Sequence, residues 1–114
     1  MKYMLLIYSN ENDGEDPEMM KGYAEFTQHV MSTGVMRGAD RLHRTEDART
    51  VRVRNGATTV TDGPYAETKE QLGRSYMVEC GSADEAIALA ARIPNAKNGS
   101  VEVRPIWEMN GDGA

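Results

Sequence analysis

The sequence has very few metal-binding or redox-active side chains: one cysteine, Cys80, and two histidines, His29 and His43, in 114 residues. A single cysteine cannot form a disulfide within the chain or supply a cysteine-based zinc site. The two histidines do not stand at an HxH or HxxxH spacing, so they do not suggest a metal-binding pair. A glycine-rich phosphate loop and a serine nucleophile elbow are also missing. We therefore expect no metal and no cofactor.

Long apolar runs are missing too. No stretch approaches the ~20 apolar residues of a membrane helix, and the apolar start is too short for a signal peptide. Acidic residues outnumber basic ones by 18 to 13, which gives a net charge of −5. Arg49, Arg52 and Arg54 lie close together, but in a short segment that makes no basic face for a nucleic acid. These absences favour a cytoplasmic protein that binds neither membranes nor nucleic acid.

The first strand is apolar on both of its faces. In residues 2–8, Tyr3, Leu5 and Ile7 alternate with a second apolar set, Met4, Leu6 and Tyr8. Such a strand is covered on both sides. One chain of this length cannot provide both covers, so the second set predicts a homodimer that packs sheet against sheet. The alternative is that the chain's own hairpin closes over this face.

Two helices have clear start signals. Asp16-Pro17 precedes an apolar stripe with helical spacing, made of Met19, Tyr23, Phe26 and Val30. Ser82 and Glu85 form a capping box. The second helix that follows is expected to bury Ala86, Ile87, Ala90 and Ile93.

The remaining segments predict strands. The second strand is expected at residues 35–42, loosened by Gly38. Residues 72–80 and 100–108 are also expected to be strands, and in the last of them Val101, Val103 and Trp107 share one side. Residues 50–54 and 57–61 flank Asn55-Gly56, a strong hairpin signal. The order predicts an α+β fold, the ferredoxin-like βαββαβ arrangement with an inserted β-hairpin. Residues 1–109 form a single domain, and residues 110–114 are a frayed tail.

Residues 62–70, Asp-Gly-Pro-Tyr-Ala-Glu-Thr-Lys-Glu, hold an unusual density of functional groups for a turn. Asp62 at the end of a strand could act as a general base, or it could cap its own backbone as an Asx-turn. Tyr65 could line a ligand pocket or pack as an aromatic plug. Glu67 could bind a ligand or form a surface ion pair with Lys69.

Two residues outside this segment complete the candidate set. Arg74 could hold an acidic ligand through its two-pronged guanidinium, or pair with a carboxylate across the sheet. His43, in the loop after the second strand, could serve in acid–base or anion-binding chemistry, or be simply solvated.

Several segments together resemble the YCII-related family, and within it the branch named for Asp-Gly-Pro-Phe. The resemblance runs through residues 1–8, 50–56, 61–73, 91–94 and 99–106, with Tyr65 in place of the phenylalanine. It implies a dimeric α+β barrel of ferredoxin-like protomers and an association with sigma factors in a stress context. Some relatives are thought to carry a His–Asp dyad. Its histidine would fall near Tyr23 and its acidic partner near Glu46 or Asp47, so the dyad does not carry over.

Two functions follow from these observations. The first is a ligand-binding or regulatory interaction module, a small dimer whose partner is a small molecule or a sigma factor. The alternative is a small cofactor-independent enzyme that uses acid–base chemistry in a cleft near Asp62.

Overall fold

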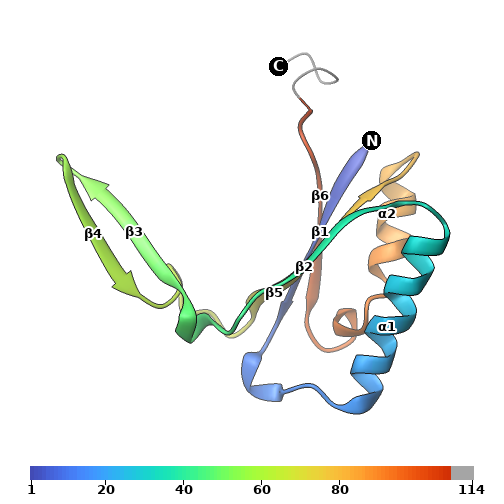
Figure 1. Cartoon of the computed structure of the whole chain (residues 1–114), viewed down its shortest axis with the longest axis horizontal. Helices are drawn as coiled ribbons and strands as arrows, with labels where there is room; N and C mark the ends of the chain where they lie inside the picture. The colour runs from blue at the N-terminus through green and yellow to red at the C-terminus, as the bar shows by residue number, and fades with distance from the viewer. Residues whose placement is uncertain (109–114) are drawn as a thin grey trace.

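The computed structural model describes residues 1–108, and its main body is a four-stranded antiparallel sheet (Figure 1). The strand order is β2-β5-β1-β6. The strands span β1 Lys2–Ser9, β2 Met36–Arg41, β5 Gln71–Glu79 and β6 Ser100–Pro105. The predicted tail, residues 110–114, lies outside the described residues.

Two helices, α1 (Pro17–Ser32) and α2 (Ala83–Ala90), lie together on one face of this sheet (Figure 1). Without the hairpin, the element order is βαββαβ with β1 and β5 in the middle of the sheet. This is the predicted ferredoxin-like α+β arrangement. Short 3-10 turns fill the connections: η1 Glu11–Asp13, η2 Thr45–Asp47 and η3 Pro94–Ala96. Neither helix has the length and hydropathy that a membrane crossing requires.

The helix starts form as the sequence predicts. The Asp16 carboxylate accepts a hydrogen bond from the Met19 amide at 2.8 Å, and Pro17 is the first helical residue. Ser82 Oγ accepts from the Glu85 amide at 3.3 Å. The Glu85 carboxylate reaches back to the Gly81 amide at 2.8 Å, one residue before the amide that a standard capping box uses.

The core lies between the sheet and the helices. Tyr3, Leu5 and Ile7 of β1 are buried there, and so are Tyr23, Phe26 and Val30 of α1. Cys80 is buried as well, and this burial raises the pKa of its thiol. The chain therefore holds Cys80 as a small apolar core residue.

One core prediction is wrong, and the last predicted strand, residues 100–108, is too long. Ile87 is 53% exposed, because the short helix α2 turns Ala86 and Ala90 toward the sheet and Ile87 lies a further 100° around the helix. Trp107 is 69% exposed, because β6 ends at Pro105 and the strand alternation stops before Trp107.

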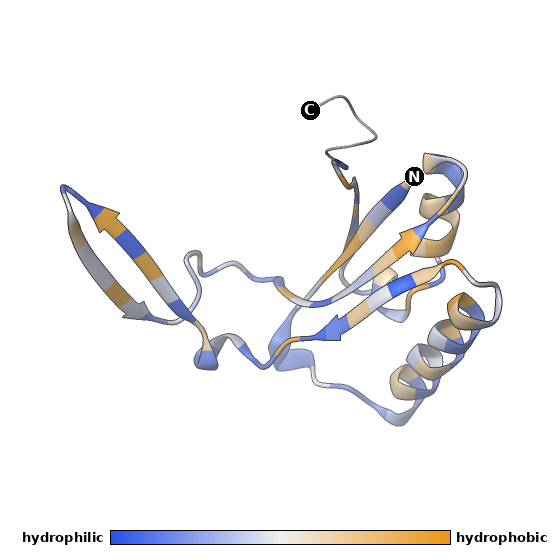
Figure 2. Cartoon of the chain, turned by 45° about the horizontal axis from the view of Figure 1, so that its top comes forward, coloured by the Kyte–Doolittle hydropathy of each residue, from blue (hydrophilic) through white to orange (hydrophobic). Residues whose placement is uncertain are grey.

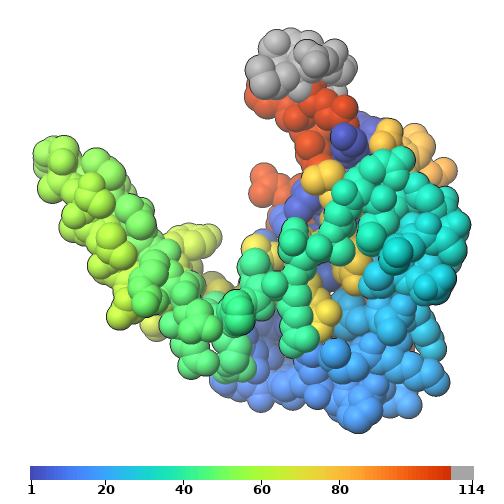
Figure 3. All heavy atoms as spheres, in the orientation of Figure 1, coloured from blue at the N-terminus to red at the C-terminus, as the bar shows by residue number. Residues whose placement is uncertain are grey.

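The hairpin of β3 (Arg49–Arg54) and β4 (Ala57–Asp62) forms a separate two-stranded sheet. Asn55 and Gly56 both have positive φ, 52° and 78°, as a tight two-residue turn requires. We call residues 49–62 the arm, because it projects from the body with an open notch between them (Figure 3). The radius of gyration is 16.2 Å, whereas a compact chain of this length has ~13 Å.

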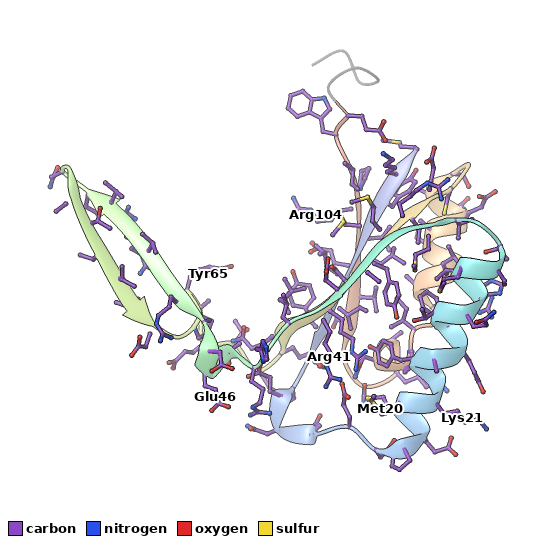
Figure 4. All side chains as sticks on the ribbon, viewed as in Figure 1. Met20, Lys21, Arg41, Glu46, Tyr65 and Arg104 are labelled. Carbon is purple, nitrogen blue, oxygen red and sulfur yellow. The ribbon has the colours of Figure 1, made fainter. Side chains whose placement is uncertain are left out.

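The sheet face opposite the helices, which we call the open face, carries Met4 and Leu6 of β1. Strand register places Met77 and Arg104 beside Met4, and Ser75 and Glu102 beside Leu6. Arg104 points away from the helices (Figure 4). All of β4 and most of β3 are exposed, so the arm does not close over this face. The alternative cover considered from the sequence is therefore not seen in the single chain.

Candidate functional site

The best-organised polar site is centred on Arg74, on the helix-facing side of β5. Its side chain is only 14% exposed, and its guanidinium lies 3.8 Å from the centroid of the Tyr23 ring on α1. Its Nη2 donates to Glu15 Oε1 at 2.6 Å. The arginine is thus held between an aromatic face and a carboxylate, which fixes the direction of its donor groups.

Arg41 brings a second guanidinium to the same carboxylate. It is the register partner of Arg74 on the neighbouring strand β2, so both side chains leave the sheet on one face. Arg41 Nη2 donates to Glu15 Oε2 at 3.0 Å. Each oxygen of Glu15 therefore accepts from a different arginine. Arg41 lies at the lower end of the sheet, beside the start of α1 (Figure 4).

Tyr23 is buried beneath the site and supports two of its residues, Arg74 and Asn95. Its hydroxyl donates to Asn95 Oδ1 at 2.5 Å, and the Asn95 amide donates to Asn98 at 3.0 Å. Burial raises the pKa of Tyr23 to about 12, although the nearby Arg74 charge acts in the opposite direction. The phenol is therefore neutral near pH 7 and serves as a fixed hydrogen-bond donor.

Glu15, Arg41, Arg74 and Asn95 line a cavity of about 220 Å³, whereas Tyr23 lies behind Arg74 and outside the lining. One wall comes from the loop after β1 and another from the end of β2. Its polar and charged lining residues are Ser9, Asn10, Glu11, Glu15, Arg41, His43, Arg44, Arg74 and Asn95.

The loop after β1 is fastened to the loop after β2. Glu11 accepts hydrogen bonds from the Thr45 amide at 2.8 Å and from the Thr45 hydroxyl at 2.6 Å. Arg44 Nη1 donates to the Glu11 carbonyl at 2.7 Å. These bonds hold the two walls of the cavity together. Arg44 is thereby engaged with the backbone, which leaves Arg41 and Arg74 as the arginines that meet a carboxylate inside the site.

The family model described as the YCII-related domain matches residues 1–110 of this chain. The chain belongs to the YCII-related family. It is 38% identical, over 114 aligned residues, to an uncharacterized protein of Rhizobium meliloti (strain 1021), with 93% of this chain and 92% of that protein covered. The solved structure of 5-chloro-2-hydroxyhydroquinone dehydrochlorinase from Burkholderia phenoliruptrix AC1100 gives a TM-score of 0.49 at 13% identity. That match covers 95% of this chain and 94% of the dehydrochlorinase.

Within this YCII-related chain, two of the five predicted site residues line the Arg74 cavity. They are Arg74 and His43. The His43 side chain is 91% exposed, and its Nδ1 lies 3.8 Å from Asp47 Oδ2. The pairing of Arg74 with a carboxylate, one of its two predicted fates, is present, but the partner is Glu15 of a loop and not a cross-strand residue.

The other three predicted residues lie elsewhere. Asp62 ends the arm with its side chain 88% exposed, and it pairs with Arg49 at 3.1 Å. Tyr65, at the root of the arm, is 83% exposed (Figure 4). Glu67 lines a second cavity of about 400 Å³, together with Arg44 and Lys69. The chain therefore does not gather residues 62–74 around one pocket, and the roles given to Asp62, Tyr65 and Glu67 stay predictions.

Sequence reasoning missed Glu15, Arg41 and Asn95 as site residues. Glu15 lies 59 positions from Arg74, in an acidic loop that reads as exposed, and only the folded sheet brings the two together. One signal was available. The position at which the family resemblance places a dyad histidine is Tyr23, and the Tyr23 ring supports Arg74, which lines this cavity.

Proposed function

We propose that this YCII-related chain is a small-molecule-binding module whose ligand carries a carboxylate or a similar planar anion. The observation that carries this proposal is the Glu15 carboxylate held between Arg41 and Arg74 at the edge of a cavity. A ligand carboxylate can take the same two guanidiniums when Glu15 moves aside. Planar two-pronged donors of this kind match a carboxylate better than lysine does.

The size of the cavity narrows the ligand class. At about 220 Å³ it is smaller than the ~300–1,000 Å³ of pockets that take drug-sized molecules. Because Arg74 is mostly buried, its charge is less screened than that of a surface arginine. The site thus suits a compact acid, with Asn95 in the lining and Tyr23 holding Asn95 and Arg74 from behind.

We further infer that the module is a cytoplasmic homodimer joined through the open face. The support is the row of apolar side chains there, Met4, Leu6 and Met77, on the side of the sheet away from the helices. We also propose a regulatory link between this homodimer and a sigma factor, as the family resemblance implies. Placement in the DGPF branch and acid–base chemistry near Asp62 remain predictions.

Ligand binding is tested by thermal unfolding with small acids such as benzoate and succinate, against neutral benzamide. A ligand at 100 times its dissociation constant stabilises the folded state by ~2.7 kcal/mol, or roughly 10 °C for a chain of this size. We expect the acids to raise Tm in the wild type and in Arg92→Met, a control at an exposed arginine. We expect Arg74→Met to lose the shift and Glu15→Gln to increase it. Equal shifts with benzamide, or an undiminished shift in Arg74→Met, would refute the proposal.

A further inference from the structure

The arm has one apolar face and one polar face. Residues paired across a hairpin share a face, so register places Val51, Val53 and Val60 together on one side. Arg52, Arg54, Thr59 and Thr61 lie on the other side. Figure 2 shows this alternation along β3. The same face also carries Thr58 and, at the root of the arm, the Arg49–Asp62 ion pair. The three valines are 57–60% exposed, so the apolar part of this face is not buried within the single chain.

The arm also has too little of its own structure to be stable by itself. Within residues 1–108, β3 and β4 pair only with each other. A single two-stranded hairpin is marginally stable in water unless its apolar face packs against something. At the root of the arm, the valine face runs into an apolar groove of about 610 Å³ that includes Leu42, Val51, Tyr65 and Leu72. The apolar surface is therefore continuous from the body outward along the arm.

We propose that the arm is a dimerisation arm: its valine face lies against a second copy of this chain, whose arm does the same in return. This inference rests on the homodimer proposed above and adds a second contact surface to it. In a two-fold symmetric dimer both copies use the same surface patch, so one valine face on each chain accounts for both arm contacts.

Interface size favours a second copy. With strands ~4.8 Å apart and ~3.3 Å of rise per residue, the open face covers on the order of 400 Å². The arm adds on the order of 200 Å², and the partner's arm covers about as much again. A symmetric dimer that uses both arms therefore has about twice the flat contact area of one that uses the sheet alone. Specific interfaces bury ~800 Å² of accessible surface on each partner, so the added area favours a stable dimer.

Charge favours the same partner. Residues 49–62 contain Arg49, Arg52, Arg54 and Asp62 as their charged side chains, a net charge of +2. Because the whole chain carries −5, the remainder carries −7. A basic arm on an acidic body is complementary to another copy of the same chain.

The test is sedimentation velocity over a concentration series, with two variants of equal charge. Val53→Lys/Val60→Lys places two lysines on the valine face, and Thr59→Lys/Thr61→Lys places two on the opposite face. We expect the wild type to sediment as twice 12.6 kDa. The valine-face variant should weaken dimerisation at least ~100-fold, since it removes two apolar contacts, and the control should stay within ~3-fold.

A chain with residues 50–61 replaced by a short Gly-Ser linker should be as weakened as the valine-face variant, with a far-UV circular dichroism spectrum of a folded body. Met77→Glu on the open face separates the two proposals. If Met77→Glu disrupts the wild-type dimer while neither arm variant does, the homodimer stands and the dimerisation arm is wrong. A monomeric wild type, at all concentrations, overturns both.

Discussion

The Arg74 guanidinium stacks on the Tyr23 ring, and its Nη2 donates a hydrogen bond to the Glu15 carboxylate. The site is therefore defined by one residue each from strand β5, helix α1 and the loop before α1. Tyr23 contributes in two separable ways. Its ring supports Arg74, and its hydroxyl donates to the buried Asn95. Phenylalanine keeps the first contribution and removes the second, which makes Tyr23→Phe an informative substitution.

We expect Tyr23→Phe to lower the free energy of unfolding at pH 7 by ~1–3 kcal/mol, because the Asn95 oxygen loses its buried donor. Acid binding should persist, since the ring remains under Arg74. Chemical denaturation measures the first effect, and the thermal-shift assay with benzoate measures the second. Loss of binding in Tyr23→Phe would show that the hydroxyl, and not the ring, supports the arginine.

Because of Tyr23, we also expect the free energy of unfolding to fall at alkaline pH. The pKa of Tyr23 is raised in the folded state from an ordinary value of 10.0 to about 12, chiefly by burial. The folded chain therefore holds this proton where the unfolded chain releases it, and the resulting stability is lost as pH rises from 10 to 12. Over that range the wild type should lose on the order of 2 kcal/mol more stability than Tyr23→Phe. Tyr65→Phe, at an exposed tyrosine, should follow the wild type.

At the scale of elements, local sequence signals were sufficient to predict where the helices and the hairpin begin and turn. Asp16, Ser82 and Asn55-Gly56 act within four residues of themselves, and each forms the predicted cap or turn. The site depends on contacts that no local signal describes. Arg41 and Arg74 become neighbours only through the β2–β5 register, and Glu15 joins them from a loop. For this reason Arg74 could be chosen as a ligand-binding candidate while its partners could not.

One close approach between elements gives a sharp prediction. Gly99 lies between η3 and β6, and a Cβ there would stand 2.2 Å from the Tyr8 carbonyl oxygen of β1. Backbone would have to move, so Gly99→Ala should lower the free energy of unfolding by ~3 kcal/mol. Gly73→Ala is the matched control, because a Cβ on Gly73 of β5 meets nothing within 4 Å. Equal stability of the two variants in urea denaturation would mean that the β1–β6 end can relax.

For the whole molecule, the proposed dimer combines two forces that respond oppositely to salt. Burial of the valine face does not weaken as sodium chloride is added, whereas attraction between the basic arm and the acidic body of its partner is screened. Arg52 and Arg54, on the polar face of the arm, carry most of the attraction while making no apolar contact.

We therefore expect wild-type dimerisation to weaken between low and high salt. Arg52→Glu/Arg54→Glu changes the arm from +2 to −2, so this variant should dimerise more weakly than the wild type at low salt and improve as salt is added. Sedimentation equilibrium at matched salt concentrations measures both slopes. If the two slopes have the same sign, the arm does not lie against the acidic body, and the valine face alone would have to account for any dimer.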